Sequence, residues 1–214
     1  MLRRVKIDPS SISQMDQSDP EFLLDAIEKN YRVIWYIKEP KPIMVEMAVK
    51  QNILALRGLP KQCDAINLLA IGIDPRALKY IPEPDERTQM AAISRNGLLV
   101  GLIENPSVEI QMAAVDNIPD AITRIKKPAV DAQLLAVGKN YKIITKITDP
   151  SVDAIKMALG FQKQQKPNPF RSLIDLTNLK LTTEDWWKIV QAFPEYHAQM
   201  NLNDEQISYA ILCS

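Results

Sequence analysis

Residues 104–117 read ENPSVEIQMAAVDN, and residues 126–139 read KKPAVDAQLLAVGK. The two stretches start 22 residues apart and carry Pro, Val, Gln and Ala-Val at the same places. A phrase that recurs at a fixed spacing predicts a repeat architecture, in which each copy is one structural unit. We therefore looked for the repeat along the whole chain before considering single motifs.

The 22-residue frame runs without a gap over residues 16–160, as six full blocks and one half block. The blocks begin at residues 16, 38, 60, 82, 104, 126 and 148, and positions 1–22 below refer to this frame. Position 11 is alanine in every block: Ala26, Ala48, Ala70, Ala92, Ala114, Ala136 and Ala158. Position 12 is aliphatic throughout. Such columns predict packing positions that recur in each unit.

Each block predicts two helices joined by a corner. Position 3 is proline in five blocks, and Asn105 followed by Pro106 is typical of a cap, so the first helix is expected to start there. Apolar residues at positions 9 and 12, with alanine between them, have helical spacing. Asparagine at position 15 fits a corner, because it tolerates the left-handed conformation and also caps helices. A second short helix, apolar at positions 19 and 22, is expected over positions 16–22.

One helix pair is too small to bury its apolar face, so neighbouring pairs must stack. The sequence therefore predicts an all-α fold, a right-handed α-solenoid of about nine stacked 22-residue two-helix repeats with divergent caps. The expected parts are a half-repeat cap at 1–15, the regular array at 16–160, an inserted loop at 161–178 and divergent capping repeats at 179–214.

The divergent end follows the frame less closely. In its two units Ile189 and Ile211 replace the invariant alanine, as expected of capping repeats. Pro194 falls in the slot of the second helix, and Asn203 is a plausible cap for a last helix. The insertion delays the partner helix of the seventh block, for which FRSLIDL (170–176) is the expected segment.

Composition limits the function classes. The chain is 46% hydrophobic and 24% charged, as in ordinary globular proteins. It has no secretion-type leader and no apolar run of about 18 residues, so we expect a cytosolic protein without a membrane span. Cys63 and Cys213 are far apart and lack metal-type spacing, which favours two reduced thiols. The formal net charge is zero, so binding to an anionic partner would need a local patch.

The phrases MAVKQNILAL (47–56) and MAAISRNGLLVGLI (90–103) resemble a short helical repeat of bacterial and bacteriophage proteins catalogued as a domain of unknown function. The resemblance covers about residues 16–160. It implies an α-helical repeat protein of bacterial or phage type, and it brings no activity, cofactor or catalytic motif. The units are more distantly similar to HEAT-type solenoids, which is a likeness of fold only.

The sequence offers little for catalysis. It has no P-loop and no glycine-rich dinucleotide turn, and its six glycines leave little material for either. His197 is the only histidine, which argues against histidine metal clusters and leaves one candidate base. The pairs Glu184–Asp185 and Asp204–Glu205 fall in first turns of expected helices, where negative charge favours the helix dipole. We therefore predict no enzyme, no catalytic residue, no metal site and no cofactor.

A row of amides occupies position 8 in four consecutive blocks: Asn67, Gln89, Gln111 and Gln133. The row predicts hydrogen bonds between repeats that satisfy partly buried amides, and the alternative is a ligand-binding row. Aromatic residues gather at other points, where they serve either the core or a protein interface. The candidate interface residues are Trp35, Tyr36, Tyr80, Trp186 and Trp187.

Charge is uneven along the chain although it sums to zero. A basic zone spans residues 126–180. Its candidate nucleic-acid contacts are Lys126, Lys127, Lys139, Lys142, Lys146, Lys163, Lys166 and Arg171. Such a zone can hold a phosphate backbone. A solvated lysine face beside acidic neighbours explains it equally well, because few arginines and aromatics accompany the lysines.

Two functions remain. The first is a non-enzymatic interaction module that binds a protein partner along the solenoid, for instance a phage-encoded antagonist of a host factor or an adaptor in the host cytoplasm. The second is a nucleic-acid-binding repeat protein that uses the basic zone. Solenoid columns report packing, so neither the partner nor the oligomeric state follows from them.

Overall fold

The computed structural model describes residues 8–60, 62–164 and 173–199. All regular structure in these ranges is helical, and no described residue lies in a strand. The chain divides into two compact units, Met1–Ile103 and Glu104–Ser214. The all-α class is therefore confirmed for the described part of the chain.

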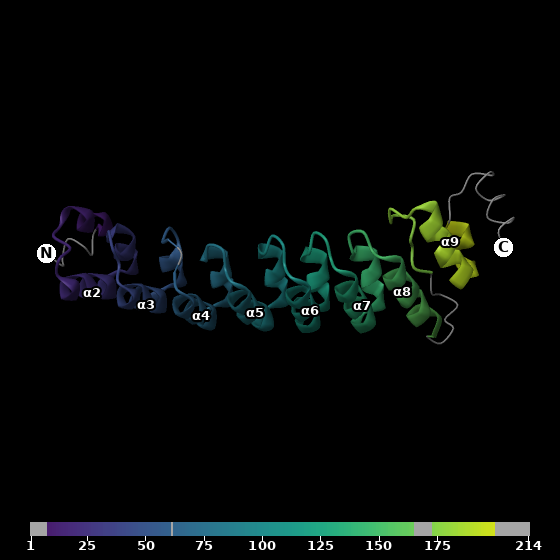
Figure 1. Ribbon diagram of the computed structural model, residues 1–214, viewed down its shortest axis with the longest axis horizontal. Helices are drawn as coiled ribbons and strands as arrows, with labels where there is room; N and C mark the ends of the chain where they lie inside the picture. Colours follow the sequence, from purple (N-terminus) through teal and green to yellow (C-terminus); the bar gives the residue numbers. More distant parts are fainter. Residues whose placement is uncertain (1–7, 61, 165–172, 200–214) are drawn as a thin grey trace. The chain divides into compact units, whose positions relative to one another are not determined.

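The first unit alternates ten-residue α helices with short 3-10 helices (Figure 1). Its α helices are α2 (Pro20–Lys29), α3 (Pro42–Gln51), α4 (Asp64–Ile73) and α5 (Glu86–Arg95). Its 3-10 helices are η1 (Pro9–Gln14), η2 (Tyr31–Tyr36), η3 (Ile53–Leu56), η4 (Pro75–Tyr80) and η5 (Gly97–Leu102). Consecutive α helices contact each other in chain order, and η2 to η5 each contact the α helix that precedes them.

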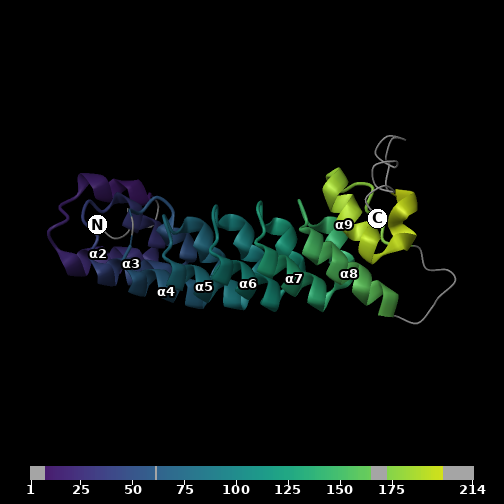
Figure 2. The ribbon, with the colours of Figure 1, turned by 45° about the vertical axis from the view of Figure 1, so that its right-hand side comes forward.

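The second unit repeats this alternation (Figure 2). Its α helices are α6 (Val108–Asn117), α7 (Val130–Lys139), α8 (Val152–Gln164) and α9 (Thr183–Ala192). Its 3-10 helices are η6 (Pro119–Arg124), η7 (Tyr141–Lys146) and η8 (Pro194–Gln199). Here too each α helix contacts the next one along the chain.

The prediction of two helices per repeat is confirmed for the blocks that start at residues 16–126, and the second helix is a 3-10 helix. Position 19 lies in this 3-10 helix, which has three residues per turn, and position 22 is the C-cap residue that follows the helix one turn later. Ile122 at position 19 and Ile125 at position 22 are both buried. The three-residue spacing of the apolar column was therefore a sign of the helix type as well as of its burial.

The first helix of most repeats begins two residues later than predicted. In α6 the N-cap is Ser107 and the helix starts at Val108, so the predicted cap, Asn105 before Pro106, is wrong. The residue before a proline avoids the helical region, which keeps position 2 outside the helix. The carbonyl oxygen of Pro106 accepts a hydrogen bond from the side chain of Gln111 at 3.0 Å, which holds the proline in the loop.

The corner residue at position 15 is extended, so the predicted left-handed conformation is wrong. Its φ angle lies between −147° and −160° at Asn30, Asn52, Asp74, Asn96 and Asn140. The side-chain oxygen of each accepts from the amide two residues later at 2.9–3.2 Å, which caps the 3-10 helix. The N–H of each bonds to the alanine carbonyl at position 11, so one extended residue ends one helix and starts the next.

The position-11 alanines are fully buried in both units, as the column predicts. The rest of the buried stripe differs from the prediction. Position 9 is only half-buried, as at Leu68 and Met112, whereas position 8 is buried in most repeats. Positions 8, 11 and 12 share one helix face at the i, i+3, i+4 spacing, and this face includes the amides of position 8.

The end regions agree with the frame in part. The half-repeat cap contains η1, and α9 and η8 follow the pattern of a repeat, with Ile189 fully buried in the place of alanine. Helix α8 continues through Gln164, four residues into the expected insertion. Residues 173–176 are not helical, so this part of the expected partner helix FRSLIDL is wrong. The predictions for Asn203, Ile211 and the pair Asp204–Glu205 concern positions outside the described residues.

Side chains replace the missing helical hydrogen bonds of this segment. The amide of Leu176 donates to Oε1 of Gln199 at 2.9 Å, and the amide of Ile174 donates to the hydroxyl oxygen of Tyr196 at 3.2 Å. The Tyr196 hydroxyl in turn donates to Oε1 of Gln162 at 2.6 Å. An extended segment is therefore stable here, because η8 and α8 satisfy its backbone.

Candidate protein-binding site

A cavity of 620 Å³ opens on the first unit beside η2 and η3. We call it the aromatic pocket. Its lining is aromatic, basic and aliphatic, and it contains no carboxylate: Pro9, Asn30, Tyr31, Arg32, Trp35, Tyr36, Leu54 and Arg57. Of the five interface residues that the sequence offers, Trp35 and Tyr36 lie here.

The repeat frame explains why these residues meet. Arg32 and Trp35 occupy positions 17 and 20 of η2, and Leu54 and Arg57 occupy the same two positions one repeat later. Residues three apart lie above one another on a 3-10 helix. The two 3-10 helices contact each other, so their matching edges form the pocket walls together.

Trp35 is held in one orientation although part of it is exposed. Its Nε1–H donates to the carbonyl oxygen of Ala55 at 3.0 Å, and the Tyr31 ring meets the indole edge to face with centroids 6.0 Å apart. The Trp35 residue remains 36% exposed, and the adjacent Tyr36 is 38% exposed. A fixed and partly exposed indole is the kind of side chain on which interface energy concentrates.

The two arginines of the pocket have no described carboxylate as an ion-pair partner. The guanidinium of Arg32 lies 5.9 Å from the centroid of the Tyr31 ring, in a cation–π contact. Arg76 in the same column is different, because it pairs with Asp74 at 2.7 Å. The aromatic pocket therefore carries positive charge that its own lining does not neutralise.

The pocket coincides with an irregular repeat. Helix η3 ends at Leu56, whereas η2 and η4 are two residues longer. Gly58 follows with a φ of 86°, a left-handed conformation that favours glycine, and a side chain added there would meet open space. Gly58 takes the column position of Tyr36 and Tyr80, so this repeat has no aromatic side chain there.

The other aromatic candidates lie elsewhere. Tyr80 is half-buried in η4 and does not line the aromatic pocket. Trp186 in α9 is buried, so its side chain serves the core of the second unit. Trp187 beside it is half-buried. The sequence reasoning missed Tyr31, Arg32 and Arg57, although the three-residue spacing of η2 and η3 would have grouped the two arginines with Trp35.

The lysines of the basic zone are partly neutralised. Lys139 pairs with Asp116 at 2.8 Å, and Lys146 pairs with Asp120 at 3.3 Å. The Nζ of Lys163 lies 5.9 Å from the centroid of the Phe193 ring. Three further lysines are exposed: Lys126, Lys127 and Lys142. The candidates Lys166 and Arg171 lie outside the described residues.

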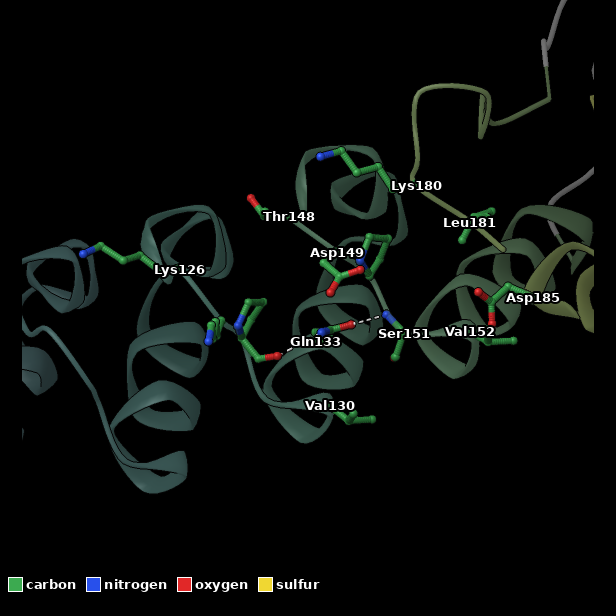
Figure 3. Close-up of a pocket in the computed structure, with 13 residues that line it drawn as sticks. Lys126, Val130, Gln133, Thr148, Asp149, Ser151, Val152, Lys180, Leu181 and Asp185 are labelled. Atoms are coloured by element: carbon green, nitrogen blue, oxygen red, sulfur yellow. Dashed lines mark hydrogen bonds between the residues drawn. The ribbon is translucent and has the colours of Figure 1, made fainter. Parts of the chain in front are cut away.

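A second cavity, of 480 Å³, lies in the second unit where the loops before α7, α8 and α9 meet (Figure 3). We call it the lysine pocket, because Lys126, Lys127 and Lys180 line it. Asp149 and Asp185 line it too, so most of the positive charge is balanced within the lining. Asp185 is also bound by Thr182, whose hydrogen bonds hold the pKa of its carboxyl below the usual value.

The amide row satisfies buried backbone groups, which confirms the first of the two interpretations for the second unit. Gln133 Nε2 donates to the carbonyl of Pro128 at 2.9 Å, and its Oε1 accepts from the Ser151 amide in the next repeat at 2.7 Å (Figure 3). Gln111 makes the same two bonds, to Pro106 and Ala129. In each of these two amides the nitrogen and the oxygen both form a hydrogen bond to the backbone.

Other sites were sought in the described part of the chain. Residues 8–60, 62–164 and 173–199 contain no group of three Asp, Glu, His or Cys side chains that could hold a metal ion. Among the described helices, none is long and apolar enough to cross a bilayer. Cys63 is exposed and free, and Cys213 lies outside the described ranges. No protein-family model, curated protein or solved structure matches this chain.

Proposed function

We propose that this chain is a non-enzymatic interaction module that binds a protein partner through the aromatic pocket. The observation that carries the proposal is Trp35, an indole that a hydrogen bond fixes and that stays partly exposed among two tyrosines and two arginines. Trp, Tyr and Arg are the residues in which the binding energy of interfaces concentrates. A side chain that is already ordered also loses little conformational entropy on binding.

The architecture that we propose for this module is a right-handed, HEAT-like α-solenoid of about nine repeats. Consecutive helix pairs contact each other within each unit, which supports stacking. Side chains at position 14 reinforce it, because Gln51, Arg95 and Lys139 each donate to a backbone carbonyl near the end of the preceding α helix. In these three repeats a side chain thus caps the helix before it.

The resemblance to bacterial and bacteriophage repeat proteins suggests a form for this function. We propose an adaptor or an antagonist of a host factor that acts in the host cytoplasm. This part rests on the phrases 47–56 and 90–103 and on no contact in the structure.

Nucleic-acid binding through the basic zone is the second candidate function. Lys126, Lys127 and Lys142 favour it, because they are exposed and none of the described ion pairs involves them. The partial neutralisation of Lys139 and Lys146 and the carboxylates of the lysine pocket weigh against it. Affinity for a phosphate backbone grows with the number of unpaired cations that reach it.

Affinity capture with matched variants tests the proposal. The wild-type chain, Trp35→Ala and Tyr80→Ala are immobilised and exposed to a bacterial lysate, and the retained proteins are compared. We expect one defined protein to stay with the wild type and with Tyr80→Ala and to be lost with Trp35→Ala, provided that circular dichroism shows both variants folded. Equal retention by all three chains would contradict the proposal. A gel shift at about 50 mM salt tests the alternative, since loss of retardation at higher salt marks phosphate contacts.

A further inference from the structure

We propose that the aromatic pocket binds an acidic segment of its protein partner, in which a carboxylate side chain stands next to a bulky apolar one. This inference rests on the proposed function and adds the chemistry of the partner. The carboxylate would lie against Arg32 or Arg57, and the apolar side chain would lie against Trp35.

Charge in the pocket is one-sided. Its lining contains two guanidinium groups and no carboxylate, and neither group has an ion pair among the described residues. The planar guanidinium offers parallel N–H donors that match the two oxygens of a carboxylate. Arg76 occupies the same repeat position as Arg32, and its guanidinium donates hydrogen bonds to the carboxylate of Asp74. Arg32 and Arg57 have no such carboxylate in the pocket, so a partner would have to supply it.

The space between the arginines suits an apolar side chain. Trp35, Leu54 and Pro9 supply apolar surface to the lining, and the cavity of 620 Å³ lies in the range of about 300–1,000 Å³ that is typical of sites for small ligands. This is room for a few side chains of a peptide. The Trp35 indole is held by the Ala55 carbonyl, so its face is presented in the unbound chain.

The surroundings favour a short acidic peptide over a nucleic acid. Single strands bind where a continuous basic groove accompanies stacking aromatics. The repeat that contains Trp35 has a net charge of minus three, and Glu21, Asp25 and Glu28 are exposed on its helix α2. A long polyanion would meet this acidic surface, whereas one or two carboxylates need only reach the two arginines.

A displayed library of random peptides tests the inference on the full chain. After selection on the wild type, the enriched peptides are synthesised and their dissociation constants are measured against three folded variants: Trp35→Ala, the double variant Arg32→Gln/Arg57→Gln, and Arg87→Gln. Arg87 is the matched control, because it is exposed in α5 and does not line the pocket. A fluorescent oligothymidylate is measured in parallel.

We expect enriched peptides with Asp or Glu beside a large apolar residue. The double variant should weaken their binding by about tenfold or more, since a hydrogen bond to a charged group contributes about 1.5–3 kcal/mol, and Arg87→Gln should leave it within about twofold. Replacing the peptide's Asp and Glu by Asn and Gln should have the same effect as the double variant.

The other outcomes separate the two proposals. Peptides that need Trp35 but carry no acid, or that tolerate the double variant, overturn the acidic partner and keep the protein-binding pocket. Peptides that tolerate Trp35→Ala, or a library without enrichment, overturn both. Oligothymidylate that binds and needs Trp35 assigns the pocket to single-stranded nucleic acid and overturns the inference.

Discussion

The two units use the same repeat, but they treat position 8 differently. In the second unit Gln111 and Gln133 each connect their own loop to the loop of the next repeat. In the first unit the same position holds Leu23, Val45, Asn67 and Gln89, and of these Gln89 makes the bond to its own loop, to the carbonyl of Pro84 at 2.8 Å. The first unit is the less regular one in its 3-10 helices, because η3 is two residues shorter than η6, η7 and η8 of the second unit.

This difference teaches where to look for function in a repeat protein. Polar groups that recur in register are engaged by neighbouring repeats, as the two glutamines are. Side chains beside the shortened η3 and the left-handed Gly58 line a pocket, as Trp35 and Arg57 do. The packing columns make the fold, and the departures from them make the surface on which a partner can be recognised.

The largest effect on stability is expected from removing one glutamine of the amide row. Gln133→Leu leaves the carbonyl of Pro128 and the amide of Ser151 without their partner, and an orphaned polar group costs about 1–3 kcal/mol when fully buried. Both bonds are partly buried, so we expect a total loss of about 2–3 kcal/mol. Chemical denaturation measures this free energy of unfolding. Gln191→Leu on the exposed side of α9 is the control and should change it little. Equal effects of the two substitutions would show that the amide row does not stabilise the second unit.

The alanine column should respond next. Ala114 is fully buried, and Ala114→Leu forces additional methyl groups into packed space, at a cost of about 1–3 kcal/mol. The neighbouring Ala113 is half-buried, and Ala113→Leu should cost less. Thermal unfolding of both variants checks this. An unchanged melting temperature for Ala114→Leu would place the column outside the packed interfaces.

The cap of α9 tests whether the divergent repeat is stabilised in its own way. Thr182 and Asp185 bind each other's amides in a capping box, and Thr182→Ala should cost about 1 kcal/mol. Because these bonds lower the folded-state pKa of Asp185 from 3.8, they stabilise the fold above that pH and the contribution disappears as the pH falls through the lowered value. The stability difference between wild type and variant should therefore be smaller in acid than at neutral pH, and the bond from the Asp185 amide to the Thr182 hydroxyl, which does not depend on ionisation, should keep it above zero. A constant difference would contradict the linkage.

The smallest effect should come from a substitution that lengthens the one asparagine of the amide row, in the first unit. Asn67 Oδ1 is buried without a hydrogen-bond partner, and its Nδ2 lies 3.5 Å from the carbonyl oxygen of Gln62, compared with 2.8–3.0 Å for the three glutamines of the column. Asn67→Gln adds the missing methylene, so we expect a gain of about 0.5–1.5 kcal/mol in the free energy of unfolding. A loss of stability would mean that a glutamine at residue 67 does not form the hydrogen bonds that the other glutamines of the row form.

Much of the fold could be predicted because the same residue types recur at the same positions of each block, so the helix assignment does not depend on any single block. The alanine column and the apolar positions 19 and 22 recur in block after block, and each copy supports the others. The helix starts could not be placed from the same columns. Pro106 is compatible both with the first turn of a helix and with the loop before it, and the choice depends on the side chain of Gln111 five residues later.

The candidate site was predicted only in part. Trp35 and Tyr36 stood out by residue type, whereas Arg57 was missed although it occupies the same repeat position as Trp35. The opposite happened with Trp186, which stood out by type and is buried. Lys139 and Lys146 looked available, but their acidic partners are 23 and 26 residues away, one repeat earlier. Pairing between repeats depends on the geometry of stacking, which a single block does not contain.

Hydrogen–deuterium exchange tests the central claim most directly, because it compares both units in one experiment. The full chain is labelled with and without a saturating library-selected peptide. We predict slower exchange in residues 31–36 and 53–57 on peptide binding and no change in residues 126–152. Protection of residues 126–152 with none around the aromatic pocket would contradict the account, since the partner would then bind the regular unit and not the one that departs from the repeat.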